Sequence, residues 1–214
     1  MSYSLRRGPL GPDEAERLAG ACRTLREKRV VWTLLDTGVL VSELVGLTRE
    51  RISLENYCLY AGICDKADRR GGIRAIPITP RIAPLLGSWF GMHESFGLSA
   101  RSVQRAVQGV AVRAGIERRV CAEALRHTFA FAAARSGMSP LDLQRLLGHR
   151  HLASTEVYFL LVPGGGLIRT ARPGGRFAAL KARPRLWRRR RQKQRRVPWS
   201  WPVWPCRTFT KGAT

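Results

Sequence analysis

The sequence lacks long apolar runs. No stretch of about 18 or more apolar residues occurs, and such a stretch is what an ordinary membrane-spanning helix requires. The first residues, MSYSLRRGPLGPDEAER, contain two arginines but no apolar segment after them, so we expect no signal peptide. These two absences predict a cytoplasmic protein without a membrane anchor.

Paired cysteine motifs are also missing. The chain has five cysteines, an odd number, and none of them stands in a C-x-x-C pair. A disulfide framework or a zinc ribbon needs paired spacing, so neither is expected. The sequence therefore predicts reduced thiols at Cys22, Cys58, Cys64, Cys121 and Cys206.

Acidic residues are scarce, and beyond residue 163 there are none. The chain carries 38 Lys and Arg against 15 Asp and Glu, a formal net charge of +23. Fifteen of the basic residues lie in 164–214, and the first 163 residues carry 23 basic and 15 acidic residues. Such an excess of positive charge favours a polyanionic partner, most simply nucleic acid.

The pattern of apolar residues divides the chain in two. Residues 1–163 contain regular apolar periodicity, whereas 164–214 are rich in Gly, Pro and Arg without it. Like charge and little patterned apolar surface predict a disordered basic tail. Arg188, Arg189, Arg190 and Arg191 could bind nucleic acid there, with tail tryptophans stacking on bases. Alternatively, the tail has little selected role, because arginine outnumbers lysine 33 to 5, as biased codon usage would produce.

The first part of the chain has the pattern of a mainly helical domain. Two segments rich in β-forming residues, 52–63 and 73–79, flank a charged tip and predict a hairpin or small meander. We expect an α+β fold, mainly α, with a small antiparallel sheet inserted between helices. Helical spacing and capping residues predict helices at 14–25, 30–38, 41–47, 81–92, 99–115, 123–137, 139–148 and 154–161. Ser42 and Ser139 are the expected caps of the third and seventh of these helices, and Gly38 and Gly148 are the expected ends of the second and seventh.

Four polar side chains stand out in the otherwise apolar segment 125–161. Arg126 could merely pair with Glu123 on one helix face, and the two histidines and the tyrosine could each be packed side chains. Together, an arginine offers paired donors to a phosphate, an imidazole can handle a proton, and a tyrosine oxygen can attack phosphorus. This combination indicates metal-free phosphoryl transfer. The four side chains are Arg126, His127, His149 and Tyr158, of which we expect His127 to be a packed or surface histidine.

The spacing of these residues resembles the catalytic domain of the tyrosine recombinase (phage integrase) family. R-H-T-F-A at 126–130 is followed by L-L-G-H at 146–149, and Tyr158 stands nine residues after the histidine. Upstream, D-T-G-V-L-V-S-E-L at 36–44 is similar to the family's T-G-x-R-x-S-E-L. R-A-I-P-I at 74–78 is similar to the end of the family's β-hairpin.

The resemblance implies a mechanism and a partner. Tyr158 would attack a phosphodiester of double-stranded DNA, giving a 3′-phosphotyrosyl link and a free 5′-hydroxyl, without metal, ATP or another cofactor. Arg126 would hold the phosphate and His149 would assist. We expect Arg126, His149 and Tyr158 to converge on one basic concave face, and a Tyr158 hydroxyl sequestered in the core would favour a structural role for the tyrosine. The family also implies a homo-oligomer assembled on DNA. The expected activity is site-specific recombination or DNA integration.

Several positions depart from the family's pattern. Leu40 stands where the family has its first phosphate-binding arginine, and Glu123 stands where it usually has His or Lys. The family's hairpin lysine corresponds to no clear position, although Lys66 carries the required ammonium. Arg69 and Arg70 on the same tip are further candidates for DNA contacts. Because losing one preorganised donor lowers a rate by ~10²–10³, cleavage could be impaired. The alternative is a catalytically inactive recombinase remnant that binds DNA without cutting it.

Two other functions fit parts of the same segment. Residues 139–161 also resemble a helix-turn-helix, in which Ser154, Thr155 and Glu156 would open a recognition helix and the protein would bind DNA without cutting it. A metal-dependent hydrolase would use His149 and His151, joined by His127 or Cys121. Paired carboxylates and a second ligand motif are missing, which disfavours a metal site.

The basic tail gives a testable prediction. Deleting residues 164–214 should weaken binding to all DNA sequences about equally and flatten the salt dependence of affinity, because counterion release scales with the number of phosphate contacts. Affinity measured at several salt concentrations, for the full and the shortened chain, checks this. An unchanged salt slope would show that the tail does not contact DNA.

Overall fold

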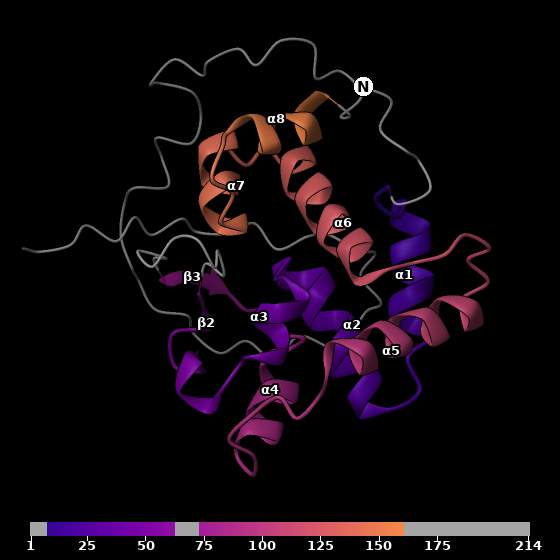
Figure 1. Cartoon of the computed structure of the whole chain (residues 1–214), viewed down its shortest axis with the longest axis vertical. Coiled ribbons are helices and arrows are strands. Elements are labelled where there is room, and N and C mark those ends of the chain that lie inside the picture. The colour runs from indigo at the N-terminus through magenta and orange to yellow at the C-terminus, as the bar shows by residue number, and fades with distance from the viewer. Residues whose placement is uncertain (1–7, 63–72, 161–214) are drawn as a thin grey trace, which may run out of the picture.

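The computed structural model describes residues 8–62 and 73–160 (Figure 1). Within them the chain is mainly helical with one small antiparallel sheet, as the sequence predicts. The helices are α1 (Pro12–Gly20), α2 (Leu25–Thr37), α3 (Val41–Val45), α4 (Ala83–Phe90), α5 (Ala100–Arg113), α6 (Ala122–Arg135), α7 (Pro140–Leu147) and α8 (Ala153–Leu160). The remaining elements are the 3-10 turn η2 (Arg49–Arg51) and the strands β1 (Ile52–Ser53), β2 (Cys58–Gly62) and β3 (Ile73–Pro77).

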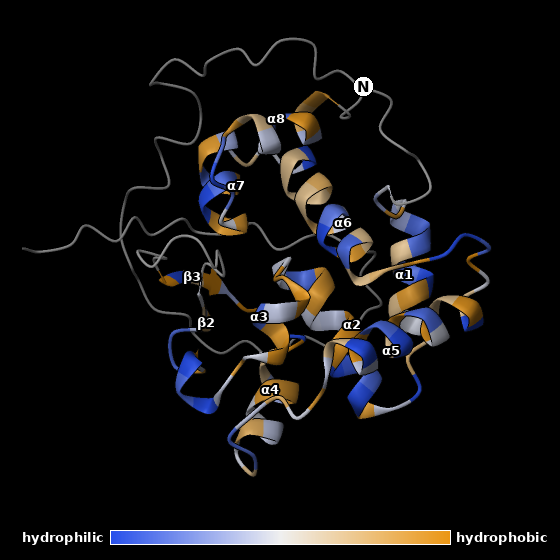
Figure 2. Cartoon of the chain, in the orientation of Figure 1, coloured by the Kyte–Doolittle hydropathy of each residue, from blue (hydrophilic) through white to orange (hydrophobic). Residues whose placement is uncertain are grey.

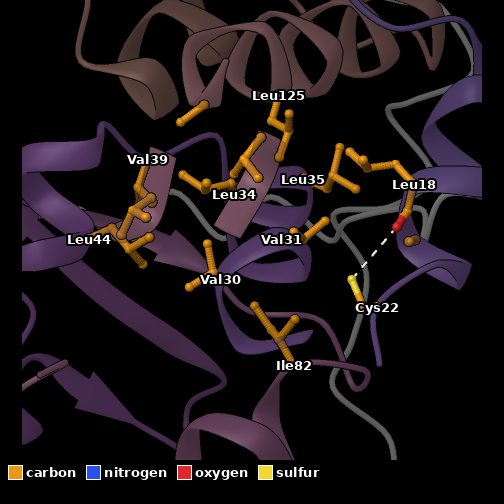
Figure 3. Close-up of a cluster of buried hydrophobic side chains, with 14 of the residues drawn as sticks. Leu18, Cys22, Val30, Val31, Leu34, Leu35, Val39, Leu44, Ile82 and Leu125 are labelled. Atoms are coloured by element: carbon orange, nitrogen blue, oxygen red, sulfur yellow. Dashed lines mark hydrogen bonds between the residues drawn. The ribbon is translucent and has the colours of Figure 1, made fainter. Parts of the chain in front are cut away.

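Helix α2 lies at the centre of the fold. It packs against α1, α4, α5 and α6, and apolar residues run along it in Figure 2. Val30, Val31, Leu34 and Leu35 are fully buried, and Figure 3 shows them facing Leu125 of α6 and other core side chains. Burying such a side chain contributes about 1.5–3 kcal/mol, so this helix anchors the elements around it.

The sheet is a three-stranded meander in the order β1-β2-β3. Leu59 of β2 pairs with Ile52 on one side and Ile76 on the other, and both Leu59 and Ile76 are fully buried. The sheet thereby fixes where β3 meets α7. The tip between β2 and β3, with Lys66, Arg69 and Arg70, lies outside the described residues.

Most predicted helix ends are confirmed. Gly38 and Gly148 follow α2 and α7 with φ of 62° and 71°, the left-handed conformation that glycine adopts most readily. The Ser139 hydroxyl accepts the Asp142 amide at the start of α7. The segments that these two glycines border meet at the candidate site described below, so these local signals determine where those segments begin.

Two predicted helix boundaries and one predicted cap were wrong. The first helix ends at Gly20 rather than Leu25, and α2 begins at Leu25 rather than at residue 30, because the Thr24 hydroxyl accepts a hydrogen bond from the Glu27 amide and caps α2. Ser42 is not a helix cap. Instead α3 begins after Leu40, whose amide donates to the Glu43 carboxylate at 2.9 Å. The Glu43 carboxylate, three residues after Leu40, therefore takes the capping role expected of the Ser42 hydroxyl.

The cysteines of the described part of the chain are free thiols. Cys22 is buried and donates to the Leu18 carbonyl at 3.6 Å (Figure 3), and burial raises the pKa of Cys22 to about 11. Cys58 and Cys121 are also unpaired. Cys64 and Cys206 lie outside the described residues, as does the tail with Arg188–Arg191.

No helix within residues 8–62 and 73–160 is long and apolar enough to cross a membrane.

The crowding at Gly38 gives a test of the fold. A Cβ added there would lie 2.3 Å from Cδ1 of Phe129 on α6, and the backbone would remain left-handed. Strain and overpacking together should lower the free energy of unfolding of Gly38→Ala by about 2–4 kcal/mol. Chemical denaturation measures the loss.

The control is Gly20→Ala at the end of α1, where nothing lies within 4 Å of an added Cβ. There alanine should be neutral or stabilising by up to about 1 kcal/mol. Equal effects at the two positions would contradict the packing of α2 on α6.

Candidate functional site

Two arginines bind the carboxyl end of α7. Arg126 on α6 donates from one terminal nitrogen to the Leu147 carbonyl at 2.7 Å and from the other to the Gly38 carbonyl at 2.6 Å. Arg74 on β3 donates from Nε to the Leu146 carbonyl at 2.8 Å. Carbonyl groups at a helix end carry partial negative charge and lack helical partners, so cations stabilise them.

Arg126 is almost fully buried, at 3% exposure. Burial is the main influence on its pKa and lowers it, while Glu123 opposes the shift. The neighbouring charges that affect this pKa include Arg74, Glu43 and the Tyr158 hydroxyl, so these groups lie within electrostatic range of the guanidinium. Arg126 is therefore at the centre of a charged cluster beneath the surface.

Arg74 and Glu43 form a buried ion pair that the sequence interpretation missed. Both terminal nitrogens of Arg74 contact the two Glu43 carboxylate oxygens, at 2.5 and 2.7 Å, and the side chains are 9% and 2% exposed. The pair joins β3 to α3. It also crowds Gly148, where an added Cβ would lie 3.0 Å from Arg74. Both residues belong to the quoted R-A-I-P-I and S-E-L segments, which was the available signal.

Tyr158 is buried, at 3% exposure, within a small apolar cluster formed by α6, α7 and α8. Its hydroxyl is 2.7 Å from Nδ1 of His127, a residue that the sequence interpretation treated as packed or exposed. His127 is instead a direct polar partner of the tyrosine. In this conformation the hydroxyl faces an imidazole and not open solvent.

His149 completes the cluster from the loop before α8. Its ring lies 6.4 Å from that of Tyr158 at an angle of 18°, and its Nδ1 forms a 2.9 Å hydrogen bond with the Thr155 hydroxyl. Burial, followed by the positive charge of Arg126, lowers the pKa of His149 to about 4. The imidazole is thus neutral near pH 7.

Glu123 lies at the exposed edge of the cluster. Its side chain is 50% exposed, and one carboxylate oxygen is 4.0 Å from Nε of Arg126 and 3.8 Å from Nε2 of His127. These are ion-pair distances rather than hydrogen bonds. The carboxylate faces both basic groups, and the positive charge of Arg126 offsets its own.

Leu40 is half-buried at the start of α3 and brings no charge to the cluster. Its amide shares the Glu43 carboxylate with Arg74. The backbone at this position is therefore tied to the cluster although the side chain has no donor. Arg126, His149 and Tyr158 do come together, but Arg126 and Tyr158 are buried rather than displayed on an open face.

The two competing interpretations find little support. Thr155 is fully buried and bonded to His149, so it cannot contact a DNA base as part of a recognition helix in this conformation. No group of three His, Cys, Asp or Glu side chains suited to a metal ion occurs in the described parts of the chain.

Comparison with known proteins identifies the class. Residues 9–161 match the phage integrase family, and the chain belongs to that family. It is 28% identical over 153 residues to tyrosine recombinase XerA of Saccharolobus solfataricus, covering 70% of this chain and 50% of the relative. It is 25% identical over 172 residues to tyrosine recombinase XerD of Listeria monocytogenes, covering 70% and 56%. The chain thus spans about half the length of the curated relatives it matches.

The fold has solved counterparts. The crystal structure of XerA recombinase superposes with a TM-score of 0.64 at 25% identity, covering 82% of this chain and 64% of that one. The catalytic domain of bacteriophage HP1 integrase superposes with a TM-score of 0.55 at 24% identity, covering 73% and 89%. The latter likeness concerns the fold, and it confirms the expected catalytic-domain architecture.

The lowered pKa of His149 predicts a pH dependence of stability. An unfolded histidine binds a proton near pH 6.5, whereas folded His149 stays neutral until about pH 4, so the unfolded state gains protons first. Stability should therefore fall as pH drops from about 6.5 to 4. His149→Gln should remove part of this loss, on the order of 1 kcal/mol once solvent screening is allowed for.

Denaturant unfolding at several pH values measures this effect. The matched control is His151→Gln, which removes an exposed histidine from the same loop. If both variants showed the same pH dependence as the unmodified protein, a buried neutral His149 would be contradicted.

Proposed function

We propose that this chain carries the DNA-cleaving unit of a tyrosine recombinase, with Tyr158 as the nucleophile. The observation that carries the proposal is the convergence of the Tyr158 hydroxyl with two imidazoles and the Arg126 guanidinium. These are a nucleophile, proton-handling groups and a phosphate-binding cation, the set that metal-free phosphoryl transfer needs. The family membership supports the same reaction class.

In the proposed reaction the Tyr158 oxygen attacks a DNA phosphorus and bonds to it. The bond from phosphorus to the 5′-oxygen breaks, leaving a 3′-phosphotyrosyl link and a free 5′-hydroxyl. Arg126 stabilises the charge on the non-bridging oxygens, and neutral His149 donates a hydrogen bond to the same group. Attack by another 5′-hydroxyl reverses the step and rejoins the strand.

The phosphate must reach a buried hydroxyl, so the proposal includes a movement of α8. This helix packs mainly on α6 and α7 and is the last described element. A shift of α8 when DNA binds would bring Tyr158 toward the phosphate. Such a shift is consistent with the small apolar cluster around Tyr158, which is separate from the main core.

The partner in this proposal is double-stranded DNA, on which copies of the protein would assemble in the cytoplasm. In this proposal the chain consists of a catalytic domain over 1–163 and a basic tail over 164–214. Lys66, Arg69 and Arg70 would contact DNA from the hairpin tip, with Lys66 donating a proton to the leaving oxygen. Arg188–Arg191 would add phosphate contacts from the tail.

A second function, DNA binding without efficient cleavage, is favoured by one observation. Leu40 supplies no donor where the family has an arginine, and Arg74, which shares the Glu43 carboxylate with the Leu40 amide, is bound to Glu43. A missing preorganised donor lowers a rate by ~10²–10³. We therefore expect cleavage by the unmodified protein to be slow.

Adduct formation separates the two functions. Incubated with a suicide DNA substrate that cannot be rejoined, the unmodified protein should form a covalent adduct slowly, and Tyr158→Phe should form none. Leu40→Arg should raise the rate by up to ~10²–10³, because it restores a phosphate donor. A denaturing gel shows the adduct, and a binding assay on the same samples shows retained DNA affinity.

The matched control for Leu40→Arg is Val112→Arg, which places the same charge at an exposed apolar position on α5. If Leu40→Arg and Val112→Arg raised adduct formation equally, the effect would be general charge rather than phosphate contact. Adduct that survives Tyr158→Phe would refute the mechanism, and binding without any adduct would leave the second function.

A further inference from the structure

We propose that His127 is the general base that takes the proton of Tyr158, and that Glu123 positions His127 for this task. This inference rests on the proposed function and adds residues to it. The family resemblance gives Glu123 only as a departure, standing where His or Lys is usual, and gives His127 no role. In this chain the geometry assigns both.

The three side chains lie in sequence along one line of polar contacts. The Tyr158 hydroxyl is 2.7 Å from Nδ1 of His127, and Nε2 on the far side of that ring is 3.8 Å from the Glu123 carboxylate. Glu123 precedes His127 by one helical turn on α6, so the helix itself sets this spacing. A carboxylate, an imidazole and a hydroxyl in this order form the arrangement that activates nucleophiles in hydrolases.

The proposed role requires one tautomer of His127. With Nδ1 accepting from the tyrosine, the neutral ring carries its proton on Nε2, which faces the carboxylate. Glu123 then favours the tautomer that leaves Nδ1 able to accept. It also stabilises the imidazolium that forms when the proton arrives, so it acts through His127 and does not touch the reacting atoms.

The charges around His127 leave it neutral and ready to accept a proton. Burial is the main cause that lowers its pKa, Arg126 lowers it further, and Glu123 raises it. Within residues 8–62 and 73–160, the groups that face it include Glu123 and Arg126 on its own helix, Tyr158 on α8, and His149 before α8. Of these only Glu123 raises the basicity of the ring.

Two protons move in the proposed cleavage step. As the Tyr158 oxygen bonds to phosphorus, its proton moves to Nδ1 of His127. The bond from phosphorus to the 5′-oxygen breaks, and its electron pair leaves on that oxygen, which takes a proton from a general acid or from solvent water. In rejoining, an incoming 5′-hydroxyl gives its proton to the conjugate base of that acid or to water as its oxygen bonds to phosphorus. The bond from phosphorus to the tyrosine oxygen then breaks, and His127 returns its proton to that oxygen.

The test isolates proton removal from leaving-group protonation. A DNA substrate with sulfur in place of the 5′-bridging oxygen releases a thiolate, which needs no proton when it leaves. Single-turnover adduct formation on this substrate, with DNA saturating, is measured from about pH 5 to pH 10 for the full chain. Thermal unfolding of each variant confirms that it is folded at the assay temperature.

With the unmodified protein the rate should rise with pH and level off above the pKa of His127. His127→Asn should be slower by ~10²-fold or more near pH 7, since a general base contributes ~10²–10⁴. Its rate should keep rising toward about pH 10, where free tyrosine ionises, so that the deficit shrinks. His151→Asn, which changes an exposed histidine of the loop before α8, is the matched control and should leave the profile unchanged.

Glu123→Gln gives an independent readout, because an exposed residue can be changed with little effect on folding. Removing the carboxylate that raises the pKa of His127 should move the inflection to lower pH and lower the plateau, since a weaker base accepts the proton less readily. Glu50→Gln removes a charge from an exposed position on η2 and should shift neither.

The outcomes are distinct. A Tyr158-dependent adduct with both pH signatures supports the proposal. A Tyr158-dependent adduct whose rate in His127→Asn is unchanged, or reduced equally at every pH, overturns the base assignment and leaves the proposed function standing. An unshifted inflection in Glu123→Gln overturns the role of Glu123. Absence of any Tyr158-dependent adduct refutes the proposed function, and the base assignment with it.

Discussion

Arg126 donates from α6 to the last carbonyl of α7 and to the Gly38 carbonyl after α2, and the geometry of the cluster depends on this one side chain. A buried guanidinium without partners would cost several kcal/mol, so the two carbonyl groups and the nearby carboxylates make its position tolerable. Both carbonyl groups lie at helix ends. The positions at which α2 and α7 end therefore determine where the Arg126 guanidinium lies. The left-handed glycines, Gly38 and Gly148, therefore serve the site as well as the fold.

The same arrangement leaves Arg126, which joins three helices, with donors for the phosphate of the proposed reaction. A guanidinium has more N–H groups than the two that these carbonyls use. Its Nε lies 4.0 Å from Glu123, at the exposed edge of the cluster. A phosphate arriving at that edge would meet a cation already oriented by the backbone, which is the preorganisation that electrostatic catalysis requires.

Buried carboxylates keep the other arginines in place. Glu43 binds Arg74, and Asp36 binds Arg81, so two positive charges near the core are committed to ion pairs. Losing one partner of such a pair leaves an uncompensated charge and destabilises strongly. These ion pairs explain the importance of position 40. Because Arg74 is bound to Glu43, a donor for a phosphate at this place would have to be the side chain of residue 40 itself.

The sequence by itself determined the mainly helical order, the glycine ends of α2 and α7, and the cap at Ser139, because each depends on residues within one helical turn. Through its motifs it also indicated that Arg126, His149 and Tyr158 act together. Only the tertiary structure decided that Arg74 pairs with Glu43 and that His127 contacts Tyr158, since the members of each pair are 31 residues apart. Burial of Tyr158 was equally undetermined by the sequence. Whether a tyrosine hydroxyl faces solvent or an imidazole depends on how α8 packs on α6, and no local pattern encodes the contact between two helices.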